Sequence, residues 1–332
     1  MEEKEIKEID KEDMYQVLKD FPLQIQKGWN LAKDVSAKDE FDKVMVSGMG
    51  GSCLPGEILK SYLDDFSMPI ILNKDYSLPA FTNEKTLLFL ISYSGNTEET
   101  INAFREAQKK LAKIIVISSG GKLKKLAEEQ QITYVEVPEG LQPRFSYGYM
   151  FLVVLRILQN CNVIENQDKA VEKTVETLRK DIFKESAEEL SEKLVDKIPV
   201  IYSSANLRAV SYKWKINFNE NSKIPAFSNV FPELNHNEMN GYVHVSGSYH
   251  VIIIKDDSDY VRTRKRMDIF KELVKQRGVE VTEIGLSGPN KLAKLISAIY
   301  IGDWVSFFLA MKRKEDPTPV KLIEEFKEKL VK

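Results

Sequence analysis

The sequence has 332 residues, which is enough for two domains of ordinary size. Hydrophobic residues make up 43% and charged residues 30%, a mixture that is typical of a globular protein and excludes a disordered chain. The 48 basic and 50 acidic residues leave a formal charge of -2, so we expect no nucleic-acid partner.

The distribution of apolar residues and cysteines predicts a cytoplasmic protein. The segment Met1–Asp13 is charged and lacks the apolar centre of a signal peptide. The longest apolar run, Ile296–Met311, is interrupted by Asp303 and favours a buried helix over a membrane span. Cys53 and Cys161 are too few for a disulfide framework or a four-ligand zinc site, and we interpret them as thiols in a reducing compartment.

Over residues 1–150, short apolar runs alternate with amphipathic stretches. The predicted strands are Val44–Ser47, Ile70–Leu72, Leu87–Ser92, Ile114–Ser118 and Thr133–Val137, and the predicted helices cover about 52–64, 97–111 and 122–130. The strands are apolar throughout rather than alternating, as expected for a parallel sheet that is covered on both faces. This half is therefore predicted to be a doubly wound α/β domain.

Residues 151–197 form a predicted helical connector, because apolar residues recur there at helical spacing. The alternation of strands and helices resumes over 198–332. The predicted strands there are Val200–Ser203, Ala226–Ser228, Val251–Lys255 and Glu280–Glu283, and the predicted helices cover about 207–220, 258–277, 289–313 and Pro319–Val331. The predicted fold class is α/β, with two doubly wound parallel-sheet domains joined by helices.

The loop Ser47–Gly56 follows the first predicted strand and opens a helix. Gly50 and Gly51 let the backbone approach a ligand closely, and Ser52 adds a hydroxyl beside the N–H groups of a helix N-terminus. A dinucleotide site is one interpretation, although Cys53 stands where its fingerprint needs glycine or alanine. A tight turn without a ligand is the other.

A second loop, Ser92–Thr100, also leaves a strand and enters a helix. Three hydroxyls, those of Ser92, Ser94 and Thr97, surround a glycine. Both loops are expected at the carboxyl edge of the sheet, where ligands bind in such folds. Neither holds the lysine of a nucleoside-triphosphate loop, so a phosphomonoester fits better. The alternative is that Asn96 or Thr97 only caps the following helix.

These two loops, together with three later motifs, resemble a known family. The later motifs are Pro143–Tyr149, Glu233–Glu238 and Asp316–Lys327. In this order they resemble the bifunctional phosphoglucose/phosphomannose isomerases, which are built from two sugar isomerase domains. The resemblance implies a metal-independent and cofactor-free aldose–ketose isomerase. It would interconvert glucose 6-phosphate and fructose 6-phosphate, and also act on mannose 6-phosphate, by ring opening and a cis-enediolate.

The resemblance also implies roles for four residues. Glu220 matches the family's base, which moves the proton between carbons 1 and 2. His236 and Lys327 match residues that open the sugar ring, and the resemblance implies that His236 comes from the neighbouring subunit of a homodimer. Arg144 could lie over the enediolate oxygen as a fixed positive charge. Without the resemblance, a solvated surface residue is the favoured interpretation of Glu220 and Lys327, and an equally good interpretation of His236 and Arg144.

Other interpretations remain open. His244 and His250 could bind a metal with Glu233 or Glu238, but their spacing matches no compact zinc signature. A non-catalytic phosphosugar-binding sensor would use the same two loops. An aminosugar-phosphate isomerase or a transferase is the third possibility. Exchange of a substrate hydrogen with solvent would distinguish an isomerase from the sensor, because a sensor cannot exchange that hydrogen.

Overall fold

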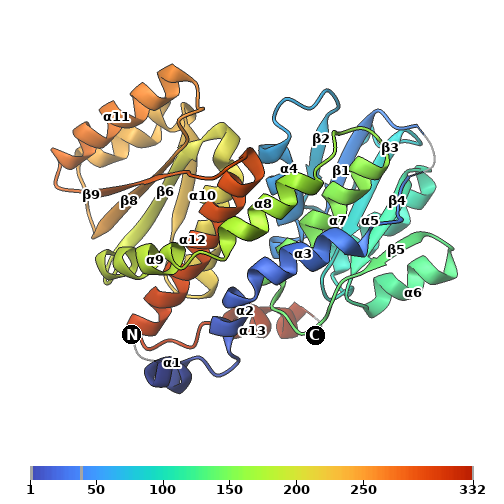
Figure 1. Cartoon of the computed structure of the whole chain (residues 1–332), viewed down its shortest axis with the longest axis horizontal. Helices are drawn as coiled ribbons and strands as arrows, with labels where there is room; N and C mark the ends of the chain where they lie inside the picture. Colours follow the sequence, from blue (N-terminus) through green and yellow to red (C-terminus); the bar gives the residue numbers. More distant parts are fainter. Residues whose placement is uncertain (1–2, 38–39, 331–332) are drawn as a thin grey trace. The chain divides into compact units, whose positions relative to one another are not determined.

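The computed structural model describes residues 3–37 and 40–330, which form two compact units (Figure 1). The N-terminal unit comprises Asp20–Arg179 and Gly288–Ala293. The C-terminal unit comprises the residues up to Lys19, Lys180–Ser287 and the residues from Lys294 onward. The units therefore divide the chain at other positions than the expected ranges 1–150, 151–197 and 198–332, and the expected connector is split between them.

The N-terminal unit contains a five-stranded parallel sheet in the order β2-β1-β3-β4-β5. Its strands are β1 (Lys43–Ser47), β2 (Ile70–Asn73), β3 (Thr86–Ile91), β4 (Lys113–Ser118) and β5 (Thr133–Glu136). All five were expected from the sequence, and every neighbouring pair is parallel. The order reverses direction beside β1, which puts the loops after β1 and β3 at the point where doubly wound sheets bind ligands.

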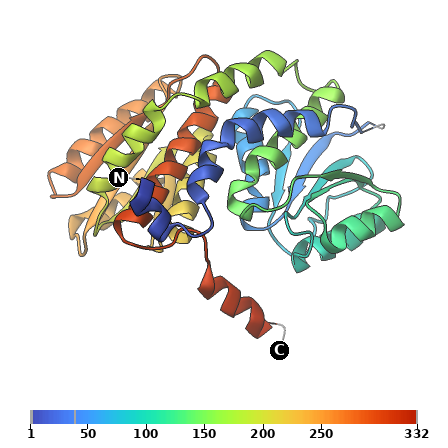
Figure 2. The ribbon, with the colours of Figure 1, turned by 60° about the horizontal axis from the view of Figure 1, so that its bottom comes forward.

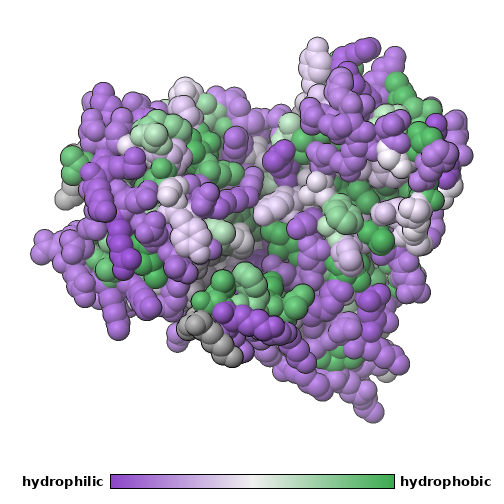
Figure 3. All heavy atoms as spheres, turned by 180° about the vertical axis from the view of Figure 1, so that it is seen from behind, coloured by the Kyte–Doolittle hydropathy of each residue, from purple (hydrophilic) through white to green (hydrophobic). Residues whose placement is uncertain are grey.

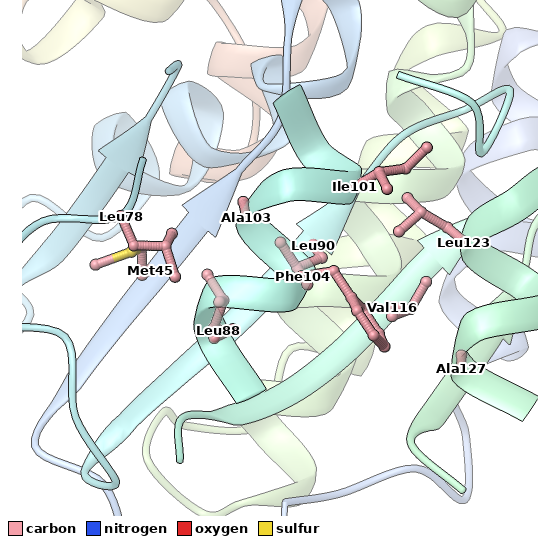
Figure 4. Packing of buried hydrophobic residues seen from close by; sticks show 11 residues of the cluster. Met45, Leu78, Leu88, Leu90, Ile101, Ala103, Phe104, Val116, Leu123 and Ala127 are labelled. Carbon is pink, nitrogen blue, oxygen red and sulfur yellow. The ribbon is translucent and has the colours of Figure 1, made fainter. Parts of the chain in front are cut away.

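Helices cover both faces of this sheet, as the continuous apolar strands predicted. The helices α5 (Glu98–Lys109) and α6 (Gly121–Glu129) pack on one face, where Met45, Leu90 and Phe104 belong to a buried core (Figure 4). The helices α4 (Leu54–Tyr62) and α7 (Tyr147–Asn160) pack together on the other side.

Three N-terminal helices were not expected from the sequence: α1 (Glu3–Ile9), α2 (Met14–Lys19) and α3 (Phe21–Leu31). In the N-terminal unit, α3 packs against α7 and α8 (Asp168–Leu178). Gly28 permits this close approach, because a Cβ there would lie 2.9 Å from the Tyr149 Cα. Pro22 and Gly28 weaken the local helical signal, so tertiary packing decides that this segment is a helix.

The C-terminal unit contains a four-stranded parallel sheet in the order β7-β6-β8-β9. Its strands are β6 (Ile198–Ser204), β7 (Phe227–Phe231), β8 (Tyr249–Lys255) and β9 (Glu280–Gly285). Its helices after α9 (Ile182–Lys193) are α10 (Arg208–Glu220), α11 (Val261–Lys275), α12 (Lys291–Lys312) and α13 (Lys321–Leu330). The two parallel sheets confirm the predicted fold class.

The helix α12 has the length and apolar composition of a membrane span, yet 89% of its most apolar window is buried inside the protein. Its charged residue Asp303 is 0% exposed and forms an ion pair with Lys213 at 2.8 Å. This confirms the prediction of a buried helix around Asp303.

The last helix, α13, stands apart from the rest of its unit (Figure 2). Its apolar residues remain exposed, with Leu322 at 80% and Phe326 at 61%. The surface in Figure 3 shows hydrophobic areas among predominantly polar side chains. The predicted helix extended to Val331, which lies outside the described residues.

Candidate active site

The loop after β1 forms a short 3-10 helix, η1 (Gly50–Ser52), before α4 begins. Gly50 has a positive φ of 50°, and a Cβ on Gly51 would lie 2.7 Å from the carbonyl oxygen of Pro143. Side chains at these two positions would therefore strain or displace the backbone. The loop therefore keeps this backbone path because both residues are glycine.

The loop after β3 is held by its own hydroxyls and by a second close backbone contact. The Ser92 and Thr97 hydroxyls lie 2.8 Å apart and share a hydrogen bond. Gly95 has a φ of 65°, and a Cβ there would lie 1.8 Å from the carbonyl oxygen of Gly120. Ser94 is exposed at the tip of this loop. The predicted phosphate residues of this loop thus lie together at one end of β3.

The side chains at the start of α5 do not cap the helix. Thr97 occupies the N-cap position without a side-chain capping hydrogen bond. The Asn96 amide donates to the carbonyl oxygen of Ser94 at 3.0 Å and accepts from the backbone N–H of Lys122 at 3.1 Å. Neither residue therefore plays the capping role that the sequence left open, and the first amides of α5 have no side-chain acceptor from them.

A direct hydrogen bond joins the two loops. The Ser52 hydroxyl accepts from the backbone N–H of Tyr93 at 3.0 Å, and Ser52 is 5% exposed. The loops lie side by side because β1 and β3 are parallel neighbours, with Ser47 paired to Leu90. The structure therefore brings the hydroxyls and glycines of both loops to one edge of the sheet in the N-terminal unit. We call Gly50, Gly51, Ser52, Ser92, Ser94 and Thr97 the cradle.

A third segment, η2 (Pro143–Phe145), packs against the first loop of the cradle. A Cβ on Gly51 would lie 2.9 Å from the Arg144 Cα. Arg144 is 2% exposed, and its guanidinium carbon lies 5.5 Å from the centre of the Phe145 ring. The predicted positive charge thus belongs to the cradle's unit and is largely removed from solvent.

Cys53 lies beneath the cradle at 0% exposure. Burial raises the pKa of its thiol to about 12. A neutral thiol is a small apolar side chain, so the residue fills space below the loop without adding charge beside it.

Glu220 is the last residue of α10, and a buried polar ladder holds this helix against α12. Lys213 and Asn217 on α10 and Asn221 directly after it follow one another at intervals of four residues, and all are 0% exposed. The Asn217 amide donates to Asp303 at 2.6 Å, and the Asn221 amide donates to the Ser306 hydroxyl at 2.9 Å. These contacts fix the end of the helix that carries the candidate base.

A cavity of about 570 Å³ lies beside Glu220 in the C-terminal unit. It is lined by Ile224 and Pro225, by Pro319 before α13 and by Ile323 in the first turn of α13. Lys223, which the sequence did not single out, also lines this cavity and donates to the backbone oxygens of Glu220 at 2.5 Å and Pro317 at 3.1 Å. Lys223 thus connects the end of α10 to the segment before α13, which lies almost a hundred residues away in the chain. No local sequence pattern indicates such a contact.

His236 lies elsewhere in the same unit, at the end of η4 (Glu233–His236). It is exposed and lines a separate cavity of about 240 Å³ with Asn235, Asn240 and Arg277. The two cavities share no lining residue. Within one chain, the C-terminal unit therefore does not bring His236 into the cavity of Glu220.

The remaining candidates are also placed. Lys327 is exposed on α13 and does not line the Glu220 cavity. His250 is 1% exposed and bonds the Thr282 hydroxyl through Nε2 at 2.8 Å, and burial lowers its pKa. Over residues 3–37 and 40–330, no three His, Cys, Asp or Glu side chains gather as a metal site.

Comparison with known proteins relates this geometry to a family. Residues 183–330 match the bacterial phospho-glucose isomerase C-terminal SIS domain. A D-glucosamine-6-phosphate 4-epimerase of Sulfolobus acidocaldarius is 34% identical, with 68% of this chain and 72% of that protein covered. Among solved structures, a hypothetical protein from Thermus thermophilus has a TM-score of 0.73 at 15% identity, covering 95% of this chain and 89% of that chain. That likeness establishes the fold.

A stronger match covers nearly the whole of both sequences. A bifunctional phosphoglucose/phosphomannose isomerase of Caldicellulosiruptor bescii is 40% identical, with 96% of this chain and 98% of that protein covered. Identity at this level over both units, each with its parallel sheet, leaves one assignment: the chain belongs to the family of bifunctional phosphoglucose/phosphomannose isomerases.

Proposed function

We propose that this enzyme interconverts glucose 6-phosphate and fructose 6-phosphate, and also accepts mannose 6-phosphate, through ring opening and a cis-enediolate. The observation that carries the proposal is the cradle, in which two glycine- and hydroxyl-rich loops are joined by the bond between Ser52 and Tyr93. Such a cradle offers neutral donors and the N-terminus of α5 to the dianion of a phosphomonoester. The names of the relatives support the same substrates.

The proposed proton transfer uses Glu220 as a single base. Its carboxylate removes the proton from carbon 2 of the open-chain aldose, which gives the enediolate. The carboxylate then returns the proton to carbon 1 while the hydroxyl proton on oxygen 2 passes to oxygen 1, which gives the ketose. Arg144 is proposed to stabilise the negative charge on the enediolate oxygen. His236 and Lys327 are proposed to open the ring by moving a proton between the ring oxygen and the hydroxyl on carbon 1.

We further propose that the enzyme acts as a homodimer in which each His236 serves the active site of the other copy. Two observations support this arrangement: the separate cavities of His236 and Glu220, and the exposure of His236. No described residue forms a hydrogen bond with its imidazole within the chain, so the ring is available to a second copy. The reaction needs no metal in this proposal, because the enediolate charge is met by Arg144 and by hydrogen-bond donors.

The test is a coupled isomerase assay with glucose 6-phosphate and mannose 6-phosphate, with and without EDTA. We expect both substrates to react and EDTA to have no effect. We expect Glu220→Gln to lower kcat by roughly 10²–10⁴-fold with little change in KM, which is the usual contribution of a general base. Glu315→Gln is the matched control, because Glu315 is another carboxylate that lines the same cavity.

Solvent deuterium separates the alternatives. An isomerase converts fructose 6-phosphate in D₂O to an aldose that carries deuterium at carbon 2, whereas a phosphosugar sensor exchanges nothing. Conversion of glucosamine 6-phosphate, with no turnover of the neutral hexose phosphates, would instead favour the aminosugar activity named for one relative. Full activity of Glu220→Gln would remove Glu220 from the mechanism.

A further inference from the structure

His236 lies in a segment that comprises η4 and η5 (Glu238–Val243). Three residues of this segment, spaced four apart, face the interior of the unit: Leu234, Glu238 and Tyr242. Leu234 is 0% and Tyr242 8% exposed, and both belong to the hydrophobic core of the C-terminal unit. His236 lies between these inward-facing residues and is exposed. The backbone on both sides of the histidine is therefore attached to the core.

Glu238 is the polar member of these three and is held at both carboxylate oxygens. The Tyr202 hydroxyl donates to Oε1 at 2.5 Å, and the Asn229 amide donates to Oε2. Tyr202 and Asn229 are register partners on the neighbouring strands β6 and β7. One carboxylate thus connects the segment to two strands of the sheet, two residues away from His236.

The donor from β6 is itself fixed. Tyr202 is 0% exposed, and its hydroxyl also shares a hydrogen bond with the Tyr242 hydroxyl at 2.8 Å. Burial raises the pKa of Tyr202 far above its usual range, so the phenol stays protonated and remains a donor. The tyrosine pair therefore ties both ends of η5 to the same strand.

A partly buried carboxylate costs desolvation, and an apolar residue at this position would avoid that cost. What the carboxylate adds is direction, because two charge-assisted hydrogen bonds fix its position and its plane. An enzyme loses activity when an acid–base residue is displaced from its working position by about 0.5–1 Å. The apolar packing of Leu234 is not directional and would not by itself fix the orientation of the segment.

We infer that Glu238, held by Tyr202 and Asn229, is a positioning residue for His236. The inference rests on the proposed function, because it assigns His236 a task that needs accurate placement. Glu238 does not touch substrate in this account and acts only through the histidine.

The test compares Glu238→Ala and Tyr202→Phe with Tyr249→Phe. Tyr249 packs against the same core, but its hydroxyl does not bond Glu238. We expect the first two variants to lower kcat by about 10- to 100-fold with little change in KM, and the control to keep native activity. Glu238→Gln, which retains an acceptor for Tyr202, should recover part of the loss. Native activity in Glu238→Ala would overturn the inference.

The same variants are then made in a His236→Ala background. If Glu238 acts through the histidine, its substitution has no further effect there, and the two losses are not additive. An undiminished loss in that background would show a structural role instead and would overturn the inference.

A measurement independent of turnover uses protein labelled with ¹³C at histidine. The His236 imidazole signal, assigned from the His236→Ala spectrum, should shift and sharpen in Glu238→Ala as the ring becomes mobile, and should be unchanged in Tyr249→Phe. An unchanged signal in Glu238→Ala contradicts the anchoring. A changed signal, combined with native turnover in His236→Ala, supports the anchoring and removes His236 from the proposed reaction.

Discussion

The two units share one strand order but carry different side chains at the ends of their central strands. The order β2-β1-β3-β4 of the N-terminal sheet corresponds to β7-β6-β8-β9 of the C-terminal sheet, and a 3-10 turn follows both β1 and β6. In the N-terminal unit, the loops after the two central strands carry glycines and hydroxyls. In the C-terminal unit, the loop after β8 instead places Asp256 and Asp259 at the corresponding edge, and both are buried.

From this difference we expect the duplicated architecture to bind one phosphate rather than two. Asp256 is held by Lys294 at 3.0 Å and by the backbone N–H of Ser258, also at 3.0 Å. A phosphate dianion at this position would have to compete with Asp256 for the Lys294 ammonium and the Ser258 N–H. We therefore expect anion binding in the N-terminal unit alone, while the C-terminal unit uses its buried polar groups to fix α10 and the His236 segment.

The largest effect is expected from breaking the ion pair that fixes α10. Lys213→Met leaves Asp303 as a buried charge without its cation, which typically costs about 3–5 kcal/mol of stability. Amide hydrogen exchange should accelerate in α10 and α12 and stay unchanged in α4 and α5. The double variant Lys213→Met/Asp303→Leu should recover most of the loss. Native exchange rates in the single variant would contradict the role of this ladder.

A smaller effect is expected at the cradle. Ser52→Ala removes one proposed donor to the phosphate and the acceptor of the Tyr93 N–H, so binding of 6-phosphogluconate should weaken by about 1.5–3 kcal/mol. The control is Ser204→Ala, at the corresponding strand end of the C-terminal unit, which should bind like the native protein. Isothermal titration measures both. An unchanged dissociation constant for Ser52→Ala would place the phosphate elsewhere. Equal losses of affinity in both variants would contradict the expectation that only the N-terminal unit binds the anion.

The smallest effect concerns Cys53, a thiol that follows β1 and has no counterpart after β6. Because burial raises its pKa to about 12, the folded protein keeps the proton while the unfolded chain loses it near its ordinary value of 9.0. The stability from this group is full below pH 9 and falls as pH rises toward 12. Between about pH 8 and about pH 10, the native protein should lose about 1 kcal/mol more than Cys53→Ala, measured by urea unfolding. Equal losses of stability in the native protein and in Cys53→Ala would show that folding does not raise the pKa of this thiol.

Sequence patterns predicted the nine strands well because their cause is local. A strand buried on both faces must be apolar throughout, as in Leu87–Ile91, and turns with positive φ favour glycine, as at Gly50 and Gly95. The helix α3 escaped notice because its stability comes from packing against α7 and α8 rather than from its own residues.

The sequence by itself determined the two parallel sheets and the family, and it predicted phosphate binding by two glycine- and hydroxyl-rich loops, since each depends on residue types at short spacing. Only the tertiary structure decided that Ser52 bonds the second loop, that Arg144 packs beside Gly51, and that His236 and Glu220 face different cavities. Only the structure also showed that Glu238 accepts hydrogen bonds from both β6 and β7. These relations join residues that are far apart in the chain, and only folding brings such residues within hydrogen-bond distance.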